Sequence, residues 1–277
     1  MPSKVISVQK SREVSALLAV PNACIIAGGT TFPQPPDDDL YLVDISGLEG
    51  MDGIKQKGTR IEIGPLTTLN AMENSMVLKA YAPALADAAA SAALPEIRER
   101  ATFGGNIAWS RIGDTAAALL ASGAKLTIRT DSDYRELPID RFWPVSGGND
   151  LEYDEWITSV SIPVPKEPFW GDAFKKTGDW DLTRKPAAAA AVRLSLDADD
   201  RITAVRGGIR TAAGHIRRMF PLEKALKNRP ATPENISGAI RMMIPAVQDH
   251  IDEKELTDLL SDILEHAVKM ARERRTL

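Results

Sequence analysis

Apolar residues recur at helical spacing in three parts of the chain. The clearest pattern lies near the end, where an apolar stripe with acidic residues before it and basic residues after it predicts a long helix whose charges suit its dipole. The stripe consists of Leu256, Leu259, Leu260, Ile263, Leu264 and Ala267. An Ala-rich helix is predicted over 83–93, starting at Pro83. Another is predicted to be capped by Asp114, to run to Ala121 and to stop at Gly123.

Short apolar or alternating runs predict strands between these helices. The predicted strands are 23–27, 40–45, 60–63, 125–129, 156–162, 172–176, 187–196 and 202–209, with short helices over 12–20 and after Thr67 or Thr68. The last three strands predict a meander. Three prolines within 163–168 predict a domain boundary. The expected domains are therefore 1–167, with subdomains of about 1–55 and 56–167, and 168–277.

Two glycine pairs carry the first candidate chemistry. Ala27-Gly28-Gly29-Thr30-Thr31 follows a predicted strand, and glycines allow backbone amides to approach an anion closely. The threonine hydroxyls add donors, so the segment suits a phosphate or a pyrophosphate. It lacks the third glycine of the dinucleotide fingerprint and the Gly-Lys-Ser/Thr of a P-loop. The alternative interpretation is an ordinary turn.

Thr102-Phe103-Gly104-Gly105-Asn106 is predicted to be a second glycine loop of similar makeup. Two such loops, far apart in the sequence, could clamp one diphosphate from two sides. Two unrelated tight turns remain the alternative on composition alone.

Composition excludes several function classes. The 277 residues carry a net charge of −4, which gives no broad positive field for nucleic acid or an anionic membrane. A single cysteine cannot form an internal disulfide, a cysteine-held zinc site or an iron–sulfur cluster within the chain, and three scattered histidines do not predict a metal site. No signal peptide or apolar run long enough to cross a bilayer is found, so a cytoplasmic protein is expected.

The second glycine segment also carries a family resemblance. Together with the downstream Gly113-Asp114, with Ile63–Thr68 and with Ala173–Lys176, it resembles the FAD-binding (medium) subunit of molybdenum hydroxylases, such as carbon monoxide dehydrogenase and xanthine dehydrogenase. The resemblance implies an α+β fold. A two-part FAD-binding domain of the PCMH/vanillyl-alcohol-oxidase type would precede an α+β C-terminal domain, in which helices back an antiparallel sheet.

The resemblance further implies where FAD would bind. Its pyrophosphate would lie between the two glycine segments, Asp114 on its ribose or adenosine side, and Lys175 near the flavin, with Ile157 against it. The implied cofactor-binding residues are Ala27, Gly28, Gly29, Thr30, Thr31, Phe32, Thr102, Gly104, Gly105, Asn106, Asp114, Ile157 and Lys175. Lys175 has a plainer alternative as a solvated strand residue, and Trp109 is a further candidate for the flavin cavity. No catalytic or metal-binding residue is expected in the chain.

The implied activity is electron transfer. Electrons would arrive from a molybdenum cofactor through [2Fe-2S] clusters and leave to NAD or another acceptor. Because one cysteine cannot hold a cluster, the molybdopterin and both clusters are expected on a large and a small partner subunit, in a dimer of heterotrimers. Two alternatives stay open: a self-sufficient FAD-dependent reductase or oxidase of related fold, and a non-catalytic scaffold with degenerate loops.

Overall fold

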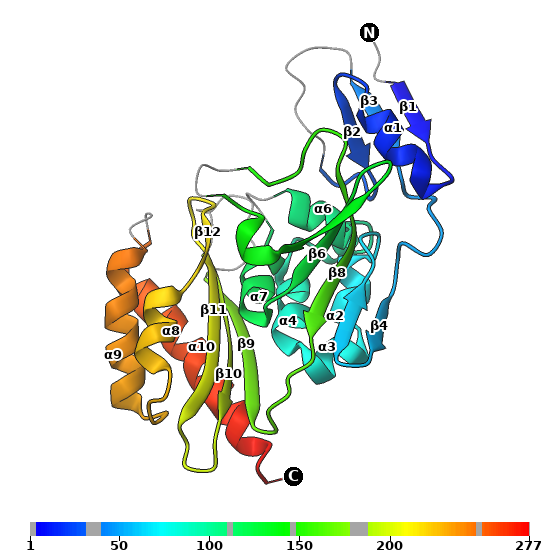
Figure 1. Cartoon of the computed structure of the whole chain (residues 1–277). Coiled ribbons are helices and arrows are strands. Elements are labelled where there is room, and N and C mark those ends of the chain that lie inside the picture. The colour runs from blue at the N-terminus through cyan, green and yellow to red at the C-terminus, as the bar shows by residue number, and fades with distance from the viewer. Residues whose placement is uncertain are drawn as a thin grey trace.

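Three sheets follow one another along the chain (Figure 1). The computed structural model describes residues 4–31, 40–109, 113–144, 148–177, 188–247 and 251–276. Helices lie beside each of the three sheets, so the α+β class predicted from the sequence is confirmed.

The first sheet forms a small N-terminal unit, drawn in blue in Figure 1. Its strands are parallel in the order β1-β3-β2, with β1 at Lys4–Ser7, β2 at Ala23–Ile26 and β3 at Tyr41–Asp44. The helical crossover of η1 (Ser11–Glu13) and α1 (Val14–Leu18) lets β1 be followed by parallel strands. Its core includes Trp156, which comes from a strand of the next sheet and so joins the two units.

The second sheet is five-stranded and antiparallel, in the order β4-β5-β8-β6-β7. Its strands are β4 (Ile54–Lys57), β5 (Arg60–Ile63), β6 (Lys125–Arg129), β7 (Tyr134–Pro138) and β8 (Trp156–Pro163), and η2 spans Ile139–Arg141. The helices of this part are α2 (Leu69–Glu73), α3 (Met76–Tyr81), α4 (Pro83–Ser91), α5 (Pro95–Arg98), α6 (Phe103–Ala108) and α7 (Thr115–Ser122). Their apolar side chains and those of the sheet form one core.

The third sheet is an antiparallel meander in the order β12-β11-β10-β9. Its strands are β9 (Trp170–Lys176), β10 (Ala189–Leu196), β11 (Ile202–Arg210) and β12 (Ile216–Arg218). The helices that follow are α8 (Phe220–Leu226), α9 (Pro233–Met243), η3 (Ile244–Ala246) and α10 (Glu253–Glu273). The apolar stripe predicted on the last helix is buried. The meander has four strands, because β12 adds one to the three that were predicted.

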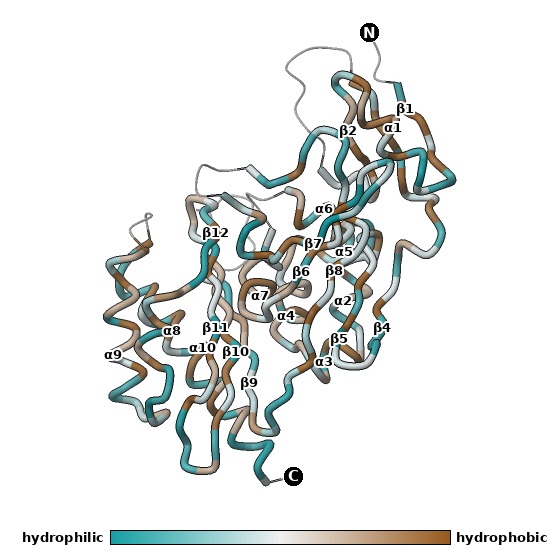
Figure 2. Tube along the Cα trace, viewed as in Figure 1, coloured by the Kyte–Doolittle hydropathy of each residue, from teal (hydrophilic) through white to brown (hydrophobic). Residues whose placement is uncertain are grey.

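Helix α7 joins the second and third sheets. All eight of its residues are buried, and Figure 2 draws it in the brown of apolar residues. It contacts β10 and β11 on one side and α4 on another. A Cβ at Gly208 would lie 2.4 Å from the Ala117 oxygen, so the strand needs glycine there for the helix to approach this closely. The third sheet is therefore packed directly onto the part of the chain that holds the second sheet.

Two local predictions about the glycine region are wrong. Residues 103–108 form helix α6 and not a loop, because Thr102 caps the helix while Phe103 and Ile107 are buried in the core. Tertiary packing here outweighs the low helix propensity of two glycines. Asp114 does precede α7, but its side chain caps no amide and forms ion pairs instead.

Candidate functional site

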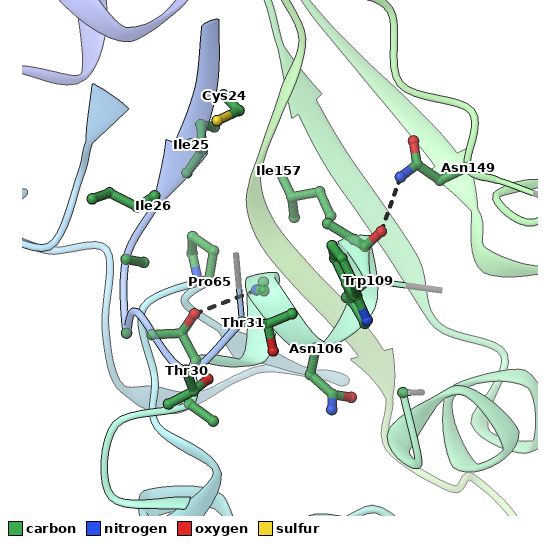
Figure 3. Close-up of a pocket in the computed structure, with 18 of the residues that line it drawn as sticks. Cys24, Ile25, Ile26, Thr30, Thr31, Pro65, Asn106, Trp109, Asn149 and Ile157 are labelled. Atoms are coloured by element: carbon green, nitrogen blue, oxygen red, sulfur yellow. Dashed lines mark hydrogen bonds between the residues drawn. The ribbon is translucent and has the colours of Figure 1, made fainter. Parts of the chain in front are cut away.

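A cavity of about 840 Å³ lies where the three parts of the chain meet. One wall comes from β2 and the segment after it, and the facing wall comes from α6, residues 113–114 and the start of β8. Lys176 and Arg210 reach it from the ends of β9 and β11. Figure 3 shows Cys24, Ile25 and Ile26 on the first wall, with Asn106 and Trp109 facing them. The volume falls in the range of about 300–1,000 Å³ that is usual for small-molecule and cofactor sites.

The first glycine segment continues β2 into the cavity and is held there by close packing. A Cβ at Gly28 would lie only 1.9 Å from the Arg100 oxygen, so only glycine permits this approach to the segment that precedes α6. Gly29 has a φ of 62°, in the left-handed region that glycine adopts without strain. Within the described parts of the chain, no acceptor is recorded for the backbone amides of residues 28–31.

The second glycine segment has its amides already engaged. Phe103 N donates to the Thr67 oxygen, Gly104 N to the Pro65 oxygen at 2.8 Å, and Gly105 N to Thr102 Oγ1 at 3.3 Å. A Cβ at Gly104 would lie 2.8 Å from Pro65 Cβ, which fixes that residue as glycine. A Cβ at Gly105 would meet only Thr102 Oγ1 within 4 Å. Gly105 therefore leaves open space at the cavity wall that a side chain would fill.

A buried ion triad lies beside the second segment. Asp114 Oδ2 accepts a hydrogen bond from Lys176 Nζ at 2.6 Å, and Asp114 Oδ1 accepts one from Arg210 Nη2 at 2.8 Å. The side chains of Asp114, Lys176 and Arg210 are only 4%, 14% and 6% exposed. Two cations share one carboxylate here, so the described groups of the triad carry one excess positive charge at the cavity.

The two lysines of β9 lie differently from what the resemblance implied. Lys175, implied to lie near the flavin, pairs with Asp262 on α10 and does not line the cavity. Successive strand residues point to opposite faces of a sheet, and the register of β9 against β10 directs Lys176 inward. Lys176 and Arg210 are thus two basic residues of the cavity that were not predicted from the sequence. The alternation of side chains along a strand indicated that one of the two lysines faces the cavity. No local sequence pattern indicated Arg210.

The other predicted residues either line the cavity or lie outside the described part of the chain. Those that line the cavity are Ala27, Gly28, Gly29, Thr30, Thr31, Thr102, Gly104, Gly105, Asn106, Asp114 and Ile157. Phe32 lies outside the described residues. Trp109, the further candidate, lines the cavity as well. Asn106 is held in place because its Oδ1 accepts a hydrogen bond from Thr115 Oγ1 at 2.5 Å.

Two ionisable groups in the cavity wall have shifted pKa values. Hydrogen bonds from Arg135 outweigh burial and lower the pKa of Glu155, whose Oε1 lies 2.7 Å from Arg135 Nε. The Cys24 thiol lies half-buried in the wall. Burial disfavours the charged thiolate and therefore raises the pKa of this thiol. No cluster of His, Cys, Asp and Glu suited to a metal ion occurs among the residues that the structure describes.

Two features of the cavity suit the FAD that the resemblance implies. Backbone amides and threonine hydroxyls of 28–31 form a donor set for an anion. On the facing wall, Gly105 leaves room that a Cβ would occupy. Both features border the same cavity.

Comparisons with known proteins identify the family of this domain. The family described as "FAD binding domain in molybdopterin dehydrogenase" matches residues 2–165, which include the N-terminal unit, the five-stranded sheet and both glycine segments. Within the described chain, no helix has the length and apolar character needed to cross a membrane.

Individual relatives extend the similarity beyond those residues. The medium subunit of nicotine 6-hydroxylase from Paenarthrobacter nicotinovorans is 30% identical over 225 residues, covering 78% of this chain and 76% of that protein. A solved chain of carbon monoxide dehydrogenase from Hydrogenophaga pseudoflava superposes with a TM-score of 0.83 at 26% identity, covering 99% of this chain and 98% of that one. Quinoline 2-oxidoreductase from Pseudomonas putida 86 shares the fold, with a TM-score of 0.80 at 21% identity and the same coverage. The chain belongs to the family of FAD-binding medium subunits of molybdenum hydroxylases.

Proposed function

We propose that this chain binds FAD in the 840 Å³ cavity and serves as the electron-transferring flavoprotein subunit of a molybdenum hydroxylase. One observation carries the proposal: two glycine segments from distant parts of the sequence border one cavity. The amides of the first have no acceptor among the described residues, and the second has a glycine that leaves clearance.

The residues of the cavity divide the work of binding. The amides of 28–31 and the hydroxyls of Thr30 and Thr31 donate hydrogen bonds to the pyrophosphate oxygens. Gly105 lets those oxygens approach the facing wall, where Asn106 offers its side-chain amide. Asp114 holds Lys176 and Arg210 in place, and their excess positive charge favours an anionic part of the cofactor.

FAD would supply a carrier that takes up and releases electrons one or two at a time. The chain itself contributes no cluster, because its single cysteine cannot ligate one. We therefore propose that [2Fe-2S] clusters on a small partner subunit and molybdopterin on a large one deliver the electrons. NAD or another acceptor would remove them. The assembly proposed is a dimer of heterotrimers.

The experiment is to titrate the full chain, freed of flavin, with FAD. We expect binding with a flavin absorption spectrum. Gly105→Ala should weaken FAD binding by about tenfold to a hundredfold, because its Cβ would push the pyrophosphate oxygens away from their donors and so cost charge-assisted hydrogen bonds. The Cβ of this alanine would lie 3.0 Å from Thr102 Oγ1, so the capping side chain must shift by a few tenths of an ångström. The higher helix propensity of alanine offsets part of that cost, and the melting temperature of the variant without FAD should change little.

The matched control is Gly238→Ala on α9, where a Cβ would meet nothing closer than 3.9 Å. It should leave the affinity for FAD unchanged. The proposal fails if the wild-type chain takes up no FAD, or if Gly105→Ala binds it as tightly as the control does. Reduction of the bound flavin by an organic substrate without partner subunits would instead favour a self-sufficient enzyme.

A further inference from the structure

A segment that belongs to no helix or strand forms part of the cavity wall. Residues 149–155 precede β8, and we call them the strap. The strap residues that line the cavity are Asn149, Leu151, Glu152, Tyr153 and Glu155. Figure 3 shows Asn149 across the cavity from Cys24 and Ile26. The strap therefore contributes a side of the cavity that faces the wall formed by β2.

Both ends of the strap are fixed in packed parts of the molecule. Near its start, Asp150 N donates to the oxygen of the buried Phe142 at 2.9 Å. Its end continues into Trp156, which is buried in the N-terminal core. Between these points Leu151 packs against the main core, whereas Tyr153 is 75% exposed. A segment that buries so little apolar surface opens at a lower free-energy cost than the core around it.

Arg135, on β7, fastens the strap at two places. Its Nε and Nη2 donate to the two carboxylate oxygens of Glu155, each at 2.7 Å. Its Nη1 donates to Asp150 Oδ2 at 2.9 Å, and its Nη2 also donates to the Asp150 backbone oxygen. Within the strap, Glu155 Oε2 accepts a hydrogen bond from Glu152 N at 3.0 Å. One guanidinium thus holds the strap near its start and at its end, and the bidentate pair with Glu155 fixes the geometry.

The strap is held mainly by side chains, and the glycine segments are held by backbone. Asn149 Nδ2 donates to the Ala108 oxygen at the end of α6, at 3.0 Å (Figure 3). The side chains of Arg135 and Asp150 are 37% and 48% exposed, so water can take the place of their partners. Gly28, in contrast, is packed against the backbone of residue 100. The strap can therefore open without breaking the backbone packing of the glycine segments.

We propose that the strap is a gate that opens to let the flavin cofactor enter and leave the cavity, and that Arg135 is the latch that holds it closed. The inference rests on the proposed function and adds to it a route of exchange. The contacts of Arg135 join one part of the chain to another. They therefore stabilise the closed strap to the same extent with and without the cofactor. Such a latch slows entry and exit equally and leaves the affinity unchanged.

The test measures how fast the full chain binds and releases FAD, followed by flavin fluorescence in stopped flow. We expect Arg135→Met to raise the association and dissociation rate constants together, by about fivefold to twentyfold, while Kd stays within about threefold. Asp150→Ala removes one exposed contact of the latch and should raise both rate constants by about twofold to threefold. The control is Lys125→Met, which breaks an ion pair with Glu136 between β6 and β7. Neither of these two residues lines the cavity, so both rate constants should stay unchanged.

Hydrogen exchange of the flavin-free chain tests the latch without any ligand. The amides of Leu151, Glu152 and Glu155 are hydrogen-bonded within the strap. In Arg135→Met these amides should exchange faster by about the same factor as the rate constants, because their exchange follows the population of the open strap. The amides of β6 should exchange as in the wild-type chain, which also shows that the variant is folded.

Three results would overturn the inference. Rate constants of Arg135→Met equal to those of Lys125→Met would mean that the strap does not gate the cavity. Faster release without faster association, and hence a weaker affinity, would give Arg135 a role only in shaping the occupied site. Unchanged exchange of the strap amides would show that Arg135 does not hold the strap. Absence of FAD binding by the wild-type chain would instead contradict the proposed function, and hydrogen exchange would still show whether Arg135 is the latch.

Discussion

The two glycine segments resemble each other in sequence and differ in state. In residues 27–31, one glycine is required by packing and the following amides have no recorded acceptor in the described chain. In residues 102–106, the amides are engaged by Thr67, Pro65 and Thr102. The first segment therefore offers donors to a ligand, whereas the second offers a rigid wall with clearance. Similar composition does not imply an equal share of binding.

Their surroundings explain the difference. The first segment leaves a small parallel sheet whose own core is joined to the rest through Trp156 and through the contact of Gly28 with residue 100. The second is the start of α6, whose Phe103 and Ile107 are buried in the main core. A segment in the main core must satisfy its amides internally. One at the edge of a small unit can leave them for a ligand.

The largest effect is expected from Gly28→Ala, which breaks the contact of the first segment with the second unit. The new Cβ would lie 1.9 Å from the Arg100 oxygen, so backbone must move. We expect a loss of about 3 kcal/mol in the free energy of unfolding, as for severe overpacking. Denaturant unfolding without FAD measures it. Gly105→Ala under the same conditions should lose much less stability, because its Cβ would meet only a side-chain oxygen, Thr102 Oγ1, at 3.0 Å. Equal losses in the two variants would contradict the comparison.

Removing one charge from the triad tests whether the surroundings of the second segment contribute to the stability of the fold. Lys176→Met leaves Asp114 with Arg210 alone, and we expect it to cost about 2 kcal/mol in the free energy of unfolding, because a partly buried ion pair is broken. Lys175→Met is the matched control. Its ion pair with Asp262 is about half exposed, so the change should stay within about 0.5 kcal/mol. A larger loss in Lys175→Met than in Lys176→Met would show that the two lysines have been assigned to the wrong faces of β9.

The smallest effects are expected from two threonines, one of which should affect mainly stability and the other mainly the affinity for FAD. Thr102→Ala removes the cap of α6 and should cost about 1 kcal/mol in the free energy of unfolding without FAD. Thr30→Ala should change that stability by less than about 0.5 kcal/mol. Its affinity for FAD should fall about fivefold to tenfold, because a hydroxyl donor to a charged group is lost. Calorimetric titration and unfolding curves together test the pair, and a destabilised Thr30→Ala would mean that the first segment is as tightly bonded as the second.

The sequence predicted those parts of the molecule whose signals are local. The stripe on α10, the stop of α7 at Gly123 and the strands of the meander follow from periodicity and from end signals. The gathering of both glycine segments at one cavity was expected from the family resemblance, since no local rule brings distant segments together.

The features that the sequence could not predict depend on distant contacts. Residues 103–108 are helical because Thr102 caps them and because they pack against Pro65 and bury Phe103 and Ile107 in the core. Alternation on β9 requires one lysine to face inward, yet the neighbouring strands decide which one does so. Asp114 looks like a helix cap until Lys176 and Arg210, from another part of the chain, surround it.

The burial of α7 between two sheets bears on how the polypeptide can be divided. Residues 163–168 read as a linker, but a fragment ending there would lose the strands that cover one side of an alanine- and leucine-rich helix. That side would face water and favour self-association. We expect limited proteolysis at these prolines to yield two pieces that stay together, and neither piece to be produced in folded form alone.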